Sequence, residues 1–352
     1  MISNGRILLL DVLDATGSDL GDARDRAALL RAAGARVTAL AIGDHLHADA
    51  RGLGRDSQVC EPGAPALHAA RLLATSDRFD HAIVASAEPG GGAVGRTLPP
   101  TLPASWWPTG LKPNAGWLGR LARSLGGREM APLFGSQADS SPPTLAALSG
   151  CFVDPQASRR ATLPLWDGEI VLAPEGFAEP HGPLAWSAFA ALADEWSELD
   201  LVTWRHPRPA DEVLARRLGA ASRIHQVGPP PRMAEWAWWS QARAVVLTGS
   251  GPLSGGLALR ALSTGCPILF IGDDEGFGGL ARELQERGCS WLVTRDARVI
   301  AAELARLLLR GPDVLAAIER GRILAAHHDR AALERRLAAA LGPPASRDAA
   351  AA

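Results

Sequence analysis

The sequence contains no tyrosine, one lysine (Lys112) and only four cysteines in 352 residues. Cys60, Cys151, Cys266 and Cys289 are widely spaced and form no CxxC pair, so they predict free thiols in a reducing compartment rather than a disulfide framework or a zinc site. Neither sign of charge is in excess, because 36 basic and 38 acidic residues give a net charge of −2. This balance argues against a nucleic-acid-binding groove, which needs a basic surface.

Long apolar runs are also missing, since no stretch approaches the roughly 20 residues that cross a bilayer. The first seven residues lead straight into a strand-like segment, without the charged region, apolar stretch and cleavage site of a secretory signal. We therefore expect a cytoplasmic protein and leave peripheral membrane contact open. With 47% apolar and 21% charged residues the chain has a globular composition, and its length predicts two domains.

The first 90 residues alternate between strand and helix patterns. Residues 6–13 and 36–42 are nearly continuous apolar runs, as expected for parallel strands that are covered on both faces. A helical composition between them, at 23–33, and a helix near 64–75 before a strand at 81–85 continue the alternation. This pattern predicts an α/β domain with a doubly wound sheet.

From about residue 90 to residue 141 the sequence is rich in glycine and proline, and we expect a long loop region with inserted helices, among them an isolated helix at 116–125. The alternation resumes at residue 169. The segments expected as strands in this second half are 169–173, 199–204, 222–227, 244–248, 267–271 and 290–293. Helical segments separate them and alanine-rich helices run to residue 341, so the second half predicts another Rossmann-like domain.

The segment from Ala244 to Gly272 reads AVVLTGSGPLSGGLALRALSTGCPILFIG. It resembles the donor-site segment of GT-B glycosyltransferases, especially the retaining, family-4-like group. In that group a strand ends in a Ser/Gly turn, a glycine-rich loop opens a helix, and an Ala-x-x-x-Gly-x-Pro motif leads into the next strand. Here the closing motif is Ala261-Leu-Ser-Thr-Gly265-Cys-Pro267.

The resemblance implies a GT-B-like α/β fold of two Rossmann-type domains that face each other across a cleft. It places an acceptor domain at 1–160, a nucleotide-sugar donor domain at 161–322, a helix at 323–342 that crosses back to the first domain and a disordered tail at 343–352. The implied activity is a glycosyltransferase of the hexosyltransferase type, which moves a sugar from a UDP-, GDP- or ADP-linked donor to a small-molecule, lipid or glycan acceptor. Enzymes of this fold generally need no metal, so no cofactor is expected.

The glycine-rich turn also has the physical properties of a diphosphate site. A turn at the carboxyl end of a parallel strand exposes backbone N–H groups, the following helix adds partial positive charge, and glycines let a phosphate come close. The alternative is a turn of an α/β protein that binds no ligand. The residues expected to bind the donor are Gly249, Ser250, Gly251, Leu253, Ser254, Gly255 and Gly256, together with Arg205 and Gly228 at the ends of two other strands.

Four positions depart from the family pattern. The two glutamates that the family places eight residues apart correspond here to Pro252 and Arg260, and its diphosphate-binding arginine and lysine correspond to Glu175 and His181. A carboxylate in place of a cation beside a diphosphate is unfavourable for electrostatic catalysis. Arg260, and His181 when it is protonated, are therefore the catalytic candidates that would restore positive charge.

Two further features belong to the domain that would bind the acceptor. Glu88, in a glycine-rich loop after a strand, is a candidate general base, although a lone carboxylate in a loop is more often only solvated. Gly17, Ser18 and Asp19 are candidates for acceptor binding, and a plain helix N-cap is the alternative.

Trp106 and Trp107 are adjacent in the region that we expect to be irregular. Two neighbouring indoles are unfavourable in water, so they should be buried, stacked on a ligand or placed in a membrane or protein interface. Long loops without regular structure are usually functional or disordered. We expect at least one of the two indoles to be exposed and to contact the acceptor.

Two other functions stay open. The missing glutamate pair and diphosphate cations favour a catalytically degenerate GT-B homologue that binds or scaffolds a protein partner. Ser250-Gly-Pro252 also resembles the donor loop of heptosyltransferases, which together with nucleotide-sugar epimerases are the alternatives with the same fold.

Overall fold

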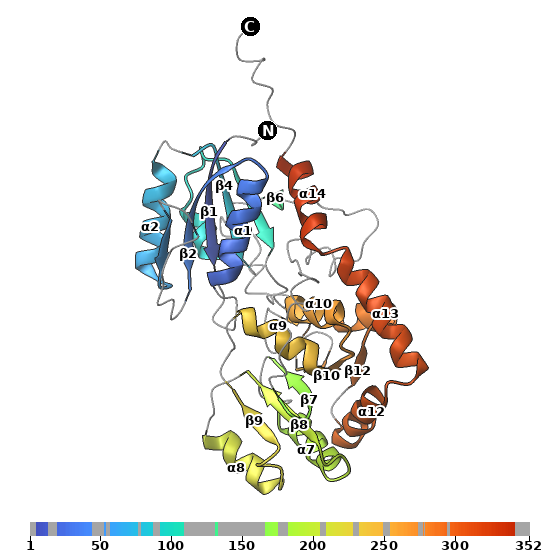
Figure 1. Ribbon diagram of the computed structural model, residues 1–352. Helices are drawn as coiled ribbons and strands as arrows, with labels where there is room; N and C mark the ends of the chain where they lie inside the picture. Colours follow the sequence, from blue (N-terminus) through green and yellow to red (C-terminus); the bar gives the residue numbers. More distant parts are fainter. Residues whose placement is uncertain are drawn as a thin grey trace. The chain divides into compact units, whose positions relative to one another are not determined.

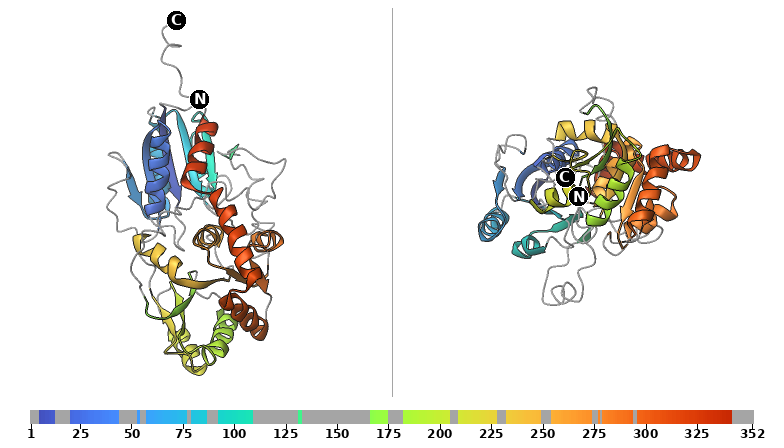
Figure 2. Two further views of the ribbon diagram at one scale, coloured as in Figure 1. Left: turned by 45° about the vertical axis from the view of Figure 1, so that its right-hand side comes forward. Right: turned by 90° about the horizontal axis from the view of Figure 1, so that it is seen from below.

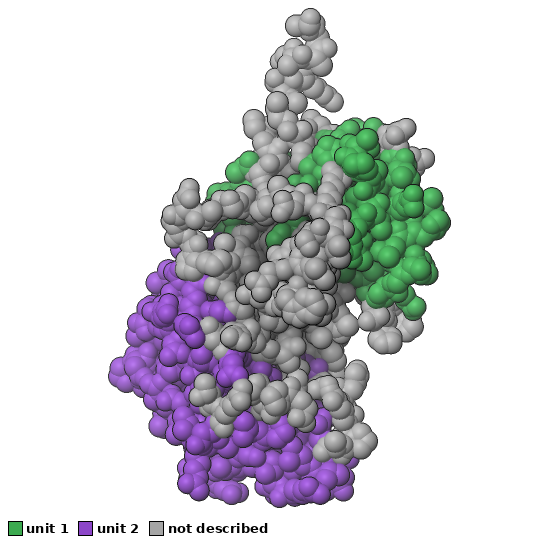
Figure 3. All heavy atoms as spheres, turned by 180° about the vertical axis from the view of Figure 1, so that it is seen from behind, with its two compact units in different colours: residues 1–151, 330–352 green, residues 152–329 purple. Residues whose placement is uncertain are grey.

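The computed structural model of the chain divides into two compact units, which Figure 3 shows in different colours. Unit 1 comprises residues 1–151 and 330–352, and unit 2 comprises residues 152–329. The residues described are 5–12, 20–43, 53, 57–76, 79–86, 92–108, 131–132, 166–174, 182–204, 209–227, 232–248, 254–273, 277, 279–293 and 296–341. The chain thus enters unit 2 once and returns to unit 1 at its end.

Unit 1 is built on a six-stranded sheet with the strand order β3-β2-β1-β4-β5-β6 (Figure 1). Every neighbouring pair is parallel, and the direction in which strands are added reverses between β1 and β4. The strands are β1 (Arg6–Val12), β2 (Arg36–Ile42), β3 (Gln58–Cys60), β4 (His81–Ser86), β5 (Ala104–Pro108) and β6 (Ala131–Pro132). The described helices are α1 (Leu20–Ala32), α2 (Ala64–Thr75), α3 (Gly92–Thr97) and α14 (Arg330–Leu341).

Different helices cover the two faces of this sheet. The face that carries Leu8, Leu10 and Leu40 packs against α2 and α3, and α2 buries a stripe of small residues there, Ala66, Ala70 and Ala74. The opposite face lies under α1, whose Arg26 makes two hydrogen bonds, of 2.6 and 2.8 Å, to the fully buried carboxylate of Asp11 in β1. Such a bidentate pair fixes both the position and the angle of a helix.

The C-terminal helix α14 packs beside α1 in this unit, as Figures 1 and 2 show. The expectation that the end of the chain crosses back to the N-terminal domain is therefore confirmed. Leu333 and Leu337 of α14 are fully buried, and they are one helical turn apart on the same face.

Unit 2 is built on a second six-stranded parallel sheet, with the order β12-β11-β10-β7-β8-β9. Its strands are β7 (Glu169–Ala173), β8 (Leu199–Thr203), β9 (Ile224–Gln226), β10 (Ala242–Leu247), β11 (Ile268–Ile271) and β12 (Trp291–Val293). The described helices are α7 (Gly182–Ala193), α8 (Pro209–Arg217), α9 (Arg232–Gln241), α10 (Ser254–Thr264), α11 (Leu280–Glu286), α12 (Ala297–Leu309) and α13 (Pro312–Ala326).

The core of unit 2 also has two layers of helices. Val171, Val246 and Leu269 of the central strands pack against Phe189 of α7 and Leu304 of α12. On the opposite face α9 and α10 pack together, and α13 packs against α10 (Figure 1). The strands are apolar on both sides because both faces are covered, which is why they read as continuous apolar runs.

The predicted α/β architecture of two Rossmann-like domains is confirmed. The expected loop region is wrong at 104–108, which is strand β5, whereas helix α3 at 92–97 agrees with the expected inserted helices. The isolated helix expected at 116–125 lies outside the described residues. None of the described helices is long and apolar enough to span a membrane.

Candidate functional site

The strand order of unit 2 singles out one place on the edge of its sheet. From β7 the chain adds β8 and β9 on one side, and then it returns to add β10, β11 and β12 on the other. In open α/β sheets, ligands bind outside the carboxyl ends of the strands at such a reversal. Here these ends are Ala173 of β7 and Leu247 of β10, followed by the buried residues Pro174 and Thr248.

The two helices that follow these strands, α7 and α10, begin at that edge. Neither has an acidic residue in its first turn. Their N-terminal N–H groups and partial positive charge are therefore not neutralised within the first turn. Other helices of the unit differ: α8 starts with Asp211 and Glu212, α13 has Asp313, and α12 is capped by the Asp296 carboxylate. The acid-free helix ends at the strand reversal suit an anion.

Gly256, in the first turn of α10, leaves open space beside the helix. Among the described residues, no atom outside the helix's own backbone lies within 4 Å of the position that a Cβ would take there. A glycine inside a helix costs about 1 kcal/mol of stability relative to alanine. Because no described neighbour would clash with a Cβ, packing does not explain why glycine occupies this position. A ligand that approaches the backbone closely does explain it.

Arg260 lies on the same face of α10 as Gly256, because the two residues are four positions apart. Both are half-buried, whereas Leu257, Ala258 and Leu259 between them are buried. Side chains on a helix lean toward its N-terminus, which from Arg260 is the direction of Gly256. The accessible face of α10 thus combines a helix N-terminus, a gap at a glycine and a guanidinium.

The Ala261-x-x-x-Gly265-x-Pro267 motif ends α10 and starts β11. Gly265 has a φ of +79°, and its N–H donates to the Leu262 carbonyl at 3.1 Å. The Cys266 N–H donates to the Ala261 carbonyl at 2.9 Å, which completes a Schellman-type helix end. The Pro267 carbonyl then accepts the Val245 N–H at 2.9 Å as β11 joins β10. The motif therefore positions α10 on the sheet through its backbone.

No family model matches the chain, and no curated protein matches it. Solved structures do. Sucrose-phosphate synthase from Thermosynechococcus elongatus matches with a TM-score of 0.67 at 14% identity, over 95% of this chain and 98% of that one. The fold is GT-B.

Two other solved structures show the same likeness. HepE from Anabaena, in complex with UDP and glucose, matches with a TM-score of 0.65 at 14% identity, over 95% of this chain and 98% of that one. UDP-GlcNAc 2-epimerase from Neisseria meningitidis, bound to UDP-GlcNAc, matches with a TM-score of 0.62 at 12% identity, over 96% and 99% of the two chains. The GT-B neighbours of this chain thus include both transferases and epimerases.

The structure brings together four of the residues predicted for a GT-B donor site, since Ser254, Gly255, Gly256 and Arg260 all lie on α10. Apart from Trp106 and Trp107, the remaining candidates lie outside the described residues: Gly249, Ser250, Gly251, Leu253, Arg205, Gly228, His181, Glu88, Gly17, Ser18 and Asp19. The shared face of Gly256 and Arg260 was not predicted, although the spacing of four residues is visible in the sequence.

The two candidate acceptor tryptophans require a correction. Trp106 and Trp107 lie in strand β5, paired with β4, and not in a loop. Trp107 is fully buried, so its indole packs in the core and has no surface to offer a ligand. Trp106 is half-buried, and its indole N–H donates to the Ser86 carbonyl at 3.0 Å. A position inside the sheet therefore buries the Trp107 indole completely and the Trp106 indole in part.

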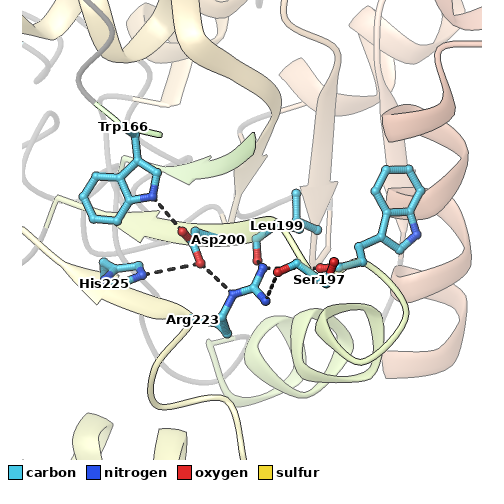
Figure 4. Close-up of polar contacts among 7 residues, drawn as sticks. Trp166, Ser197, Leu199, Asp200, Arg223 and His225 are labelled. Carbon is cyan, nitrogen blue, oxygen red and sulfur yellow. Dashed lines mark hydrogen bonds and ion pairs between the residues drawn. The ribbon is translucent and has the colours of Figure 1, made fainter. Parts of the chain in front are cut away.

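A polar cluster at the opposite, amino edge of the unit 2 sheet has a different character (Figure 4). The Asp200 carboxylate of β8 accepts hydrogen bonds from the Trp166 indole and the Arg223 guanidinium, both at 2.7 Å, and lies 3.5 Å from His225 Nε2. Arg223 also donates to the carbonyls of Ser197 and Leu199. Burial alone raises the pKa of Asp200, but the hydrogen bonds and the neighbouring cations outweigh it and hold that pKa below its ordinary value.

Proposed function

We propose that this protein is a glycosyltransferase that binds a UDP-linked sugar at the carboxyl edge of the unit 2 sheet. The observation that carries the proposal is the accessible face of α10, where the open space at Gly256 adjoins a helix N-terminus and Arg260. Two proteins of the same fold were solved with UDP-containing ligands, which supports uridine as the nucleotide. The likeness at 12% to 14% identity supports the fold, and the residues of α10 support the ligand.

The chemistry follows from where negative charge develops. When the bond between the sugar and the diphosphate breaks, the leaving diphosphate gains charge, and groups fixed in advance to meet that charge lower the barrier. The N–H groups that open α7 and α10 and the Arg260 guanidinium are the groups that we assign to this task. They would replace the arginine and lysine that the family pattern provides and that this sequence lacks at Glu175 and His181.

A titration with UDP tests the binding step. At a UDP concentration of about one hundred times the dissociation constant, the free energy of unfolding should rise by about 2.7 kcal/mol. Gly255→Val should abolish this stabilisation, because a branched side chain in the first turn of α10 blocks close approach to the backbone. Ser263→Val, on the same helix near its C-terminal end, is the matched control and should still bind UDP. Equal UDP binding by both variants would remove α10 from the site.

Turnover separates the proposed transferase from its alternatives. Release of UDP from a UDP-sugar that depends on an added acceptor supports the transferase. The likeness to UDP-GlcNAc 2-epimerase makes an epimerase the second candidate. That enzyme would convert UDP-GlcNAc to its C2 epimer without any acceptor. UDP binding without either reaction would instead indicate a binding or scaffolding protein of this fold.

A further inference from the structure

Unit 1 contains an open pocket at the amino edge of its sheet, the edge opposite to the carboxyl ends of its strands. Its volume is about 690 Å³, and it is lined by the first residues of β1, β2 and β3, by Arg31 near the end of α1 and by residues along α2 and its C-cap, from Pro65 to Ser76. Sites for small molecules have volumes of about 300–1,000 Å³. The pocket is therefore large enough for a ligand of ordinary metabolite size, and it is separate from the α10 face in unit 2.

Arginines from neighbouring strands dominate this pocket. Arg6 of β1 and Arg36 of β2 are direct partners in the parallel register, so their side chains leave the same face of the sheet next to each other. Like charges in adjacent positions of a sheet are destabilising. Arg31 of α1 adds a third guanidinium, which donates to the carbonyls of Val37 and Leu53, and burial lowers its pKa.

The two strand arginines are exposed, and their side chains are unpaired within the described part of the chain. Neither the Arg6 nor the Arg36 guanidinium makes an ion pair or hydrogen bond with any described residue, and no described lining residue is acidic. Asp80 follows the lining residue Phe79, and its carboxylate accepts the backbone N–H of Arg6 at 2.6 Å. His68 of α2 adds a further nitrogen donor to the wall.

The nearby end of α2 does not account for the arginines either. Basic side chains often serve to satisfy the last carbonyls of a helix. Here the hydroxyl of Thr75 donates to the carbonyls of Arg71 and Leu72, and the hydroxyl of Ser76 donates to that of Leu73. The helix and its cap thus satisfy these carbonyls with their own residues. The guanidinium groups of Arg6 and Arg36 therefore stay available to a ligand.

The rest of the wall is apolar. Leu72 is 58% exposed, although it is a leucine, and Leu73, Pro65 and Phe79 line the pocket beside it. Guanidinium forks match the oxygens of a phosphate, and a dianion answers two adjacent positive charges better than a monoanion does. We propose that this pocket binds a phosphate group that is carried on an apolar or aromatic moiety.

Two sources could supply such a group, a soluble phosphate ester or the headgroup of an anionic lipid, and the test has an arm for each. In the first, phenyl phosphate and inorganic phosphate are titrated calorimetrically into the full chain with UDP present, so that the α10 face does not contribute. In the second, the protein is floated with phosphatidylcholine vesicles with and without phosphatidylglycerol. Saturable binding in the first arm assigns a soluble ester, and binding in the second arm alone assigns a lipid.

The deciding variant is Arg6→Gln with Arg36→Gln, and the matched control is Arg71→Gln with Arg96→Gln, which removes the same charge from exposed helix positions of unit 1. The pocket variant should bind at least tenfold more weakly in the arm that responds, and the control should bind as the unchanged chain does. The melting temperature of the pocket variant should stay level or rise, because a repulsive pair is removed. No saturable binding in either arm, equal loss in both variants, or a destabilised pocket variant would overturn the proposal.

Discussion

The two edges of the unit 2 sheet treat polar groups in opposite ways. At the amino edge, the Asp200 carboxylate accepts hydrogen bonds from Trp166 and Arg223 and lies 3.5 Å from His225 Nε2 (Figure 4). At the carboxyl edge, α10 starts without an acidic residue, and the space beside Gly256 is open. A carboxylate that pairs with neighbouring donors stabilises the fold, whereas a helix face that is left open is suited to a ligand. We therefore expect substitutions at the amino edge to change stability and substitutions at the carboxyl edge to change ligand binding.

The largest effect is expected from Asp200→Ala. This change leaves the Trp166 indole N–H and the Arg223 Nε without their carboxylate acceptor, so the free energy of unfolding should fall by about 2 kcal/mol. Chemical denaturation with urea measures it. UDP affinity should not change, because the cluster lies at the edge away from α10. A loss of UDP binding in a folded Asp200→Ala protein would mean that the two edges are not independent.

The pH dependence of stability provides a second test of the role of Asp200. The folded-state pKa of Asp200 is below its ordinary value of 3.8, so the carboxylate contributes stability above that value and loses it as the pH falls through the folded-state pKa. The unchanged protein should therefore lose more stability than Asp200→Asn between about pH 5 and pH 2. Other carboxyl groups titrate alike in both proteins, so the difference between the two denaturation series belongs to Asp200. Parallel series would contradict the lowered pKa.

The sequence predicts the sheets well because their signals are local. The apolar run from Ile7 to Leu10 is fully buried, as a strand covered on both faces should be. Gly265 marks the end of α10, because a residue without a Cβ is favoured at its φ of +79°. These features depend on a few neighbouring residues, and a single sequence contains them.

The sequence fails where distant segments decide the outcome. Strand β5 is five residues long and follows Pro103, so it resembles a loop until its pairing with β4 is known. The Asp200 cluster joins residues that lie 34, 23 and 25 positions from Asp200 (Trp166, Arg223 and His225). Arg6 and Arg36 lie side by side because of the register between β1 and β2, and the sequence alone does not give this register. Of the candidate donor site, the helix could be predicted from its glycine-rich start, but the open face of that helix could not.

A smaller effect, confined to binding, is expected from Arg260→Gln. Hydrogen bonds to a charged group contribute about 1.5–3 kcal/mol, so UDP affinity should fall by at least about 1.5 kcal/mol, or roughly tenfold, if the guanidinium contacts the diphosphate. Isothermal titration calorimetry measures the loss. Arg298→Gln is the control, since Arg298 is an exposed arginine on α12 of the same unit. Matching affinities in the two variants would show that Arg260 plays no part in donor binding.

The smallest effect is expected from Gly256→Ala, and its sign separates the two readings of this glycine. Alanine is the better helix former by about 0.5–1 kcal/mol, and no described residue outside the helix backbone has an atom within 4 Å of the new Cβ. The free energy of unfolding should therefore rise by about that amount. If a diphosphate approaches the backbone here, the same methyl group occupies the ligand's space, and UDP binding should weaken while the fold becomes more stable. Urea denaturation and calorimetry on one preparation give both quantities. A protein that is more stable and binds UDP unchanged would show that the open space at Gly256 is not part of the site, and a less stable protein would show that the glycine is required by the fold.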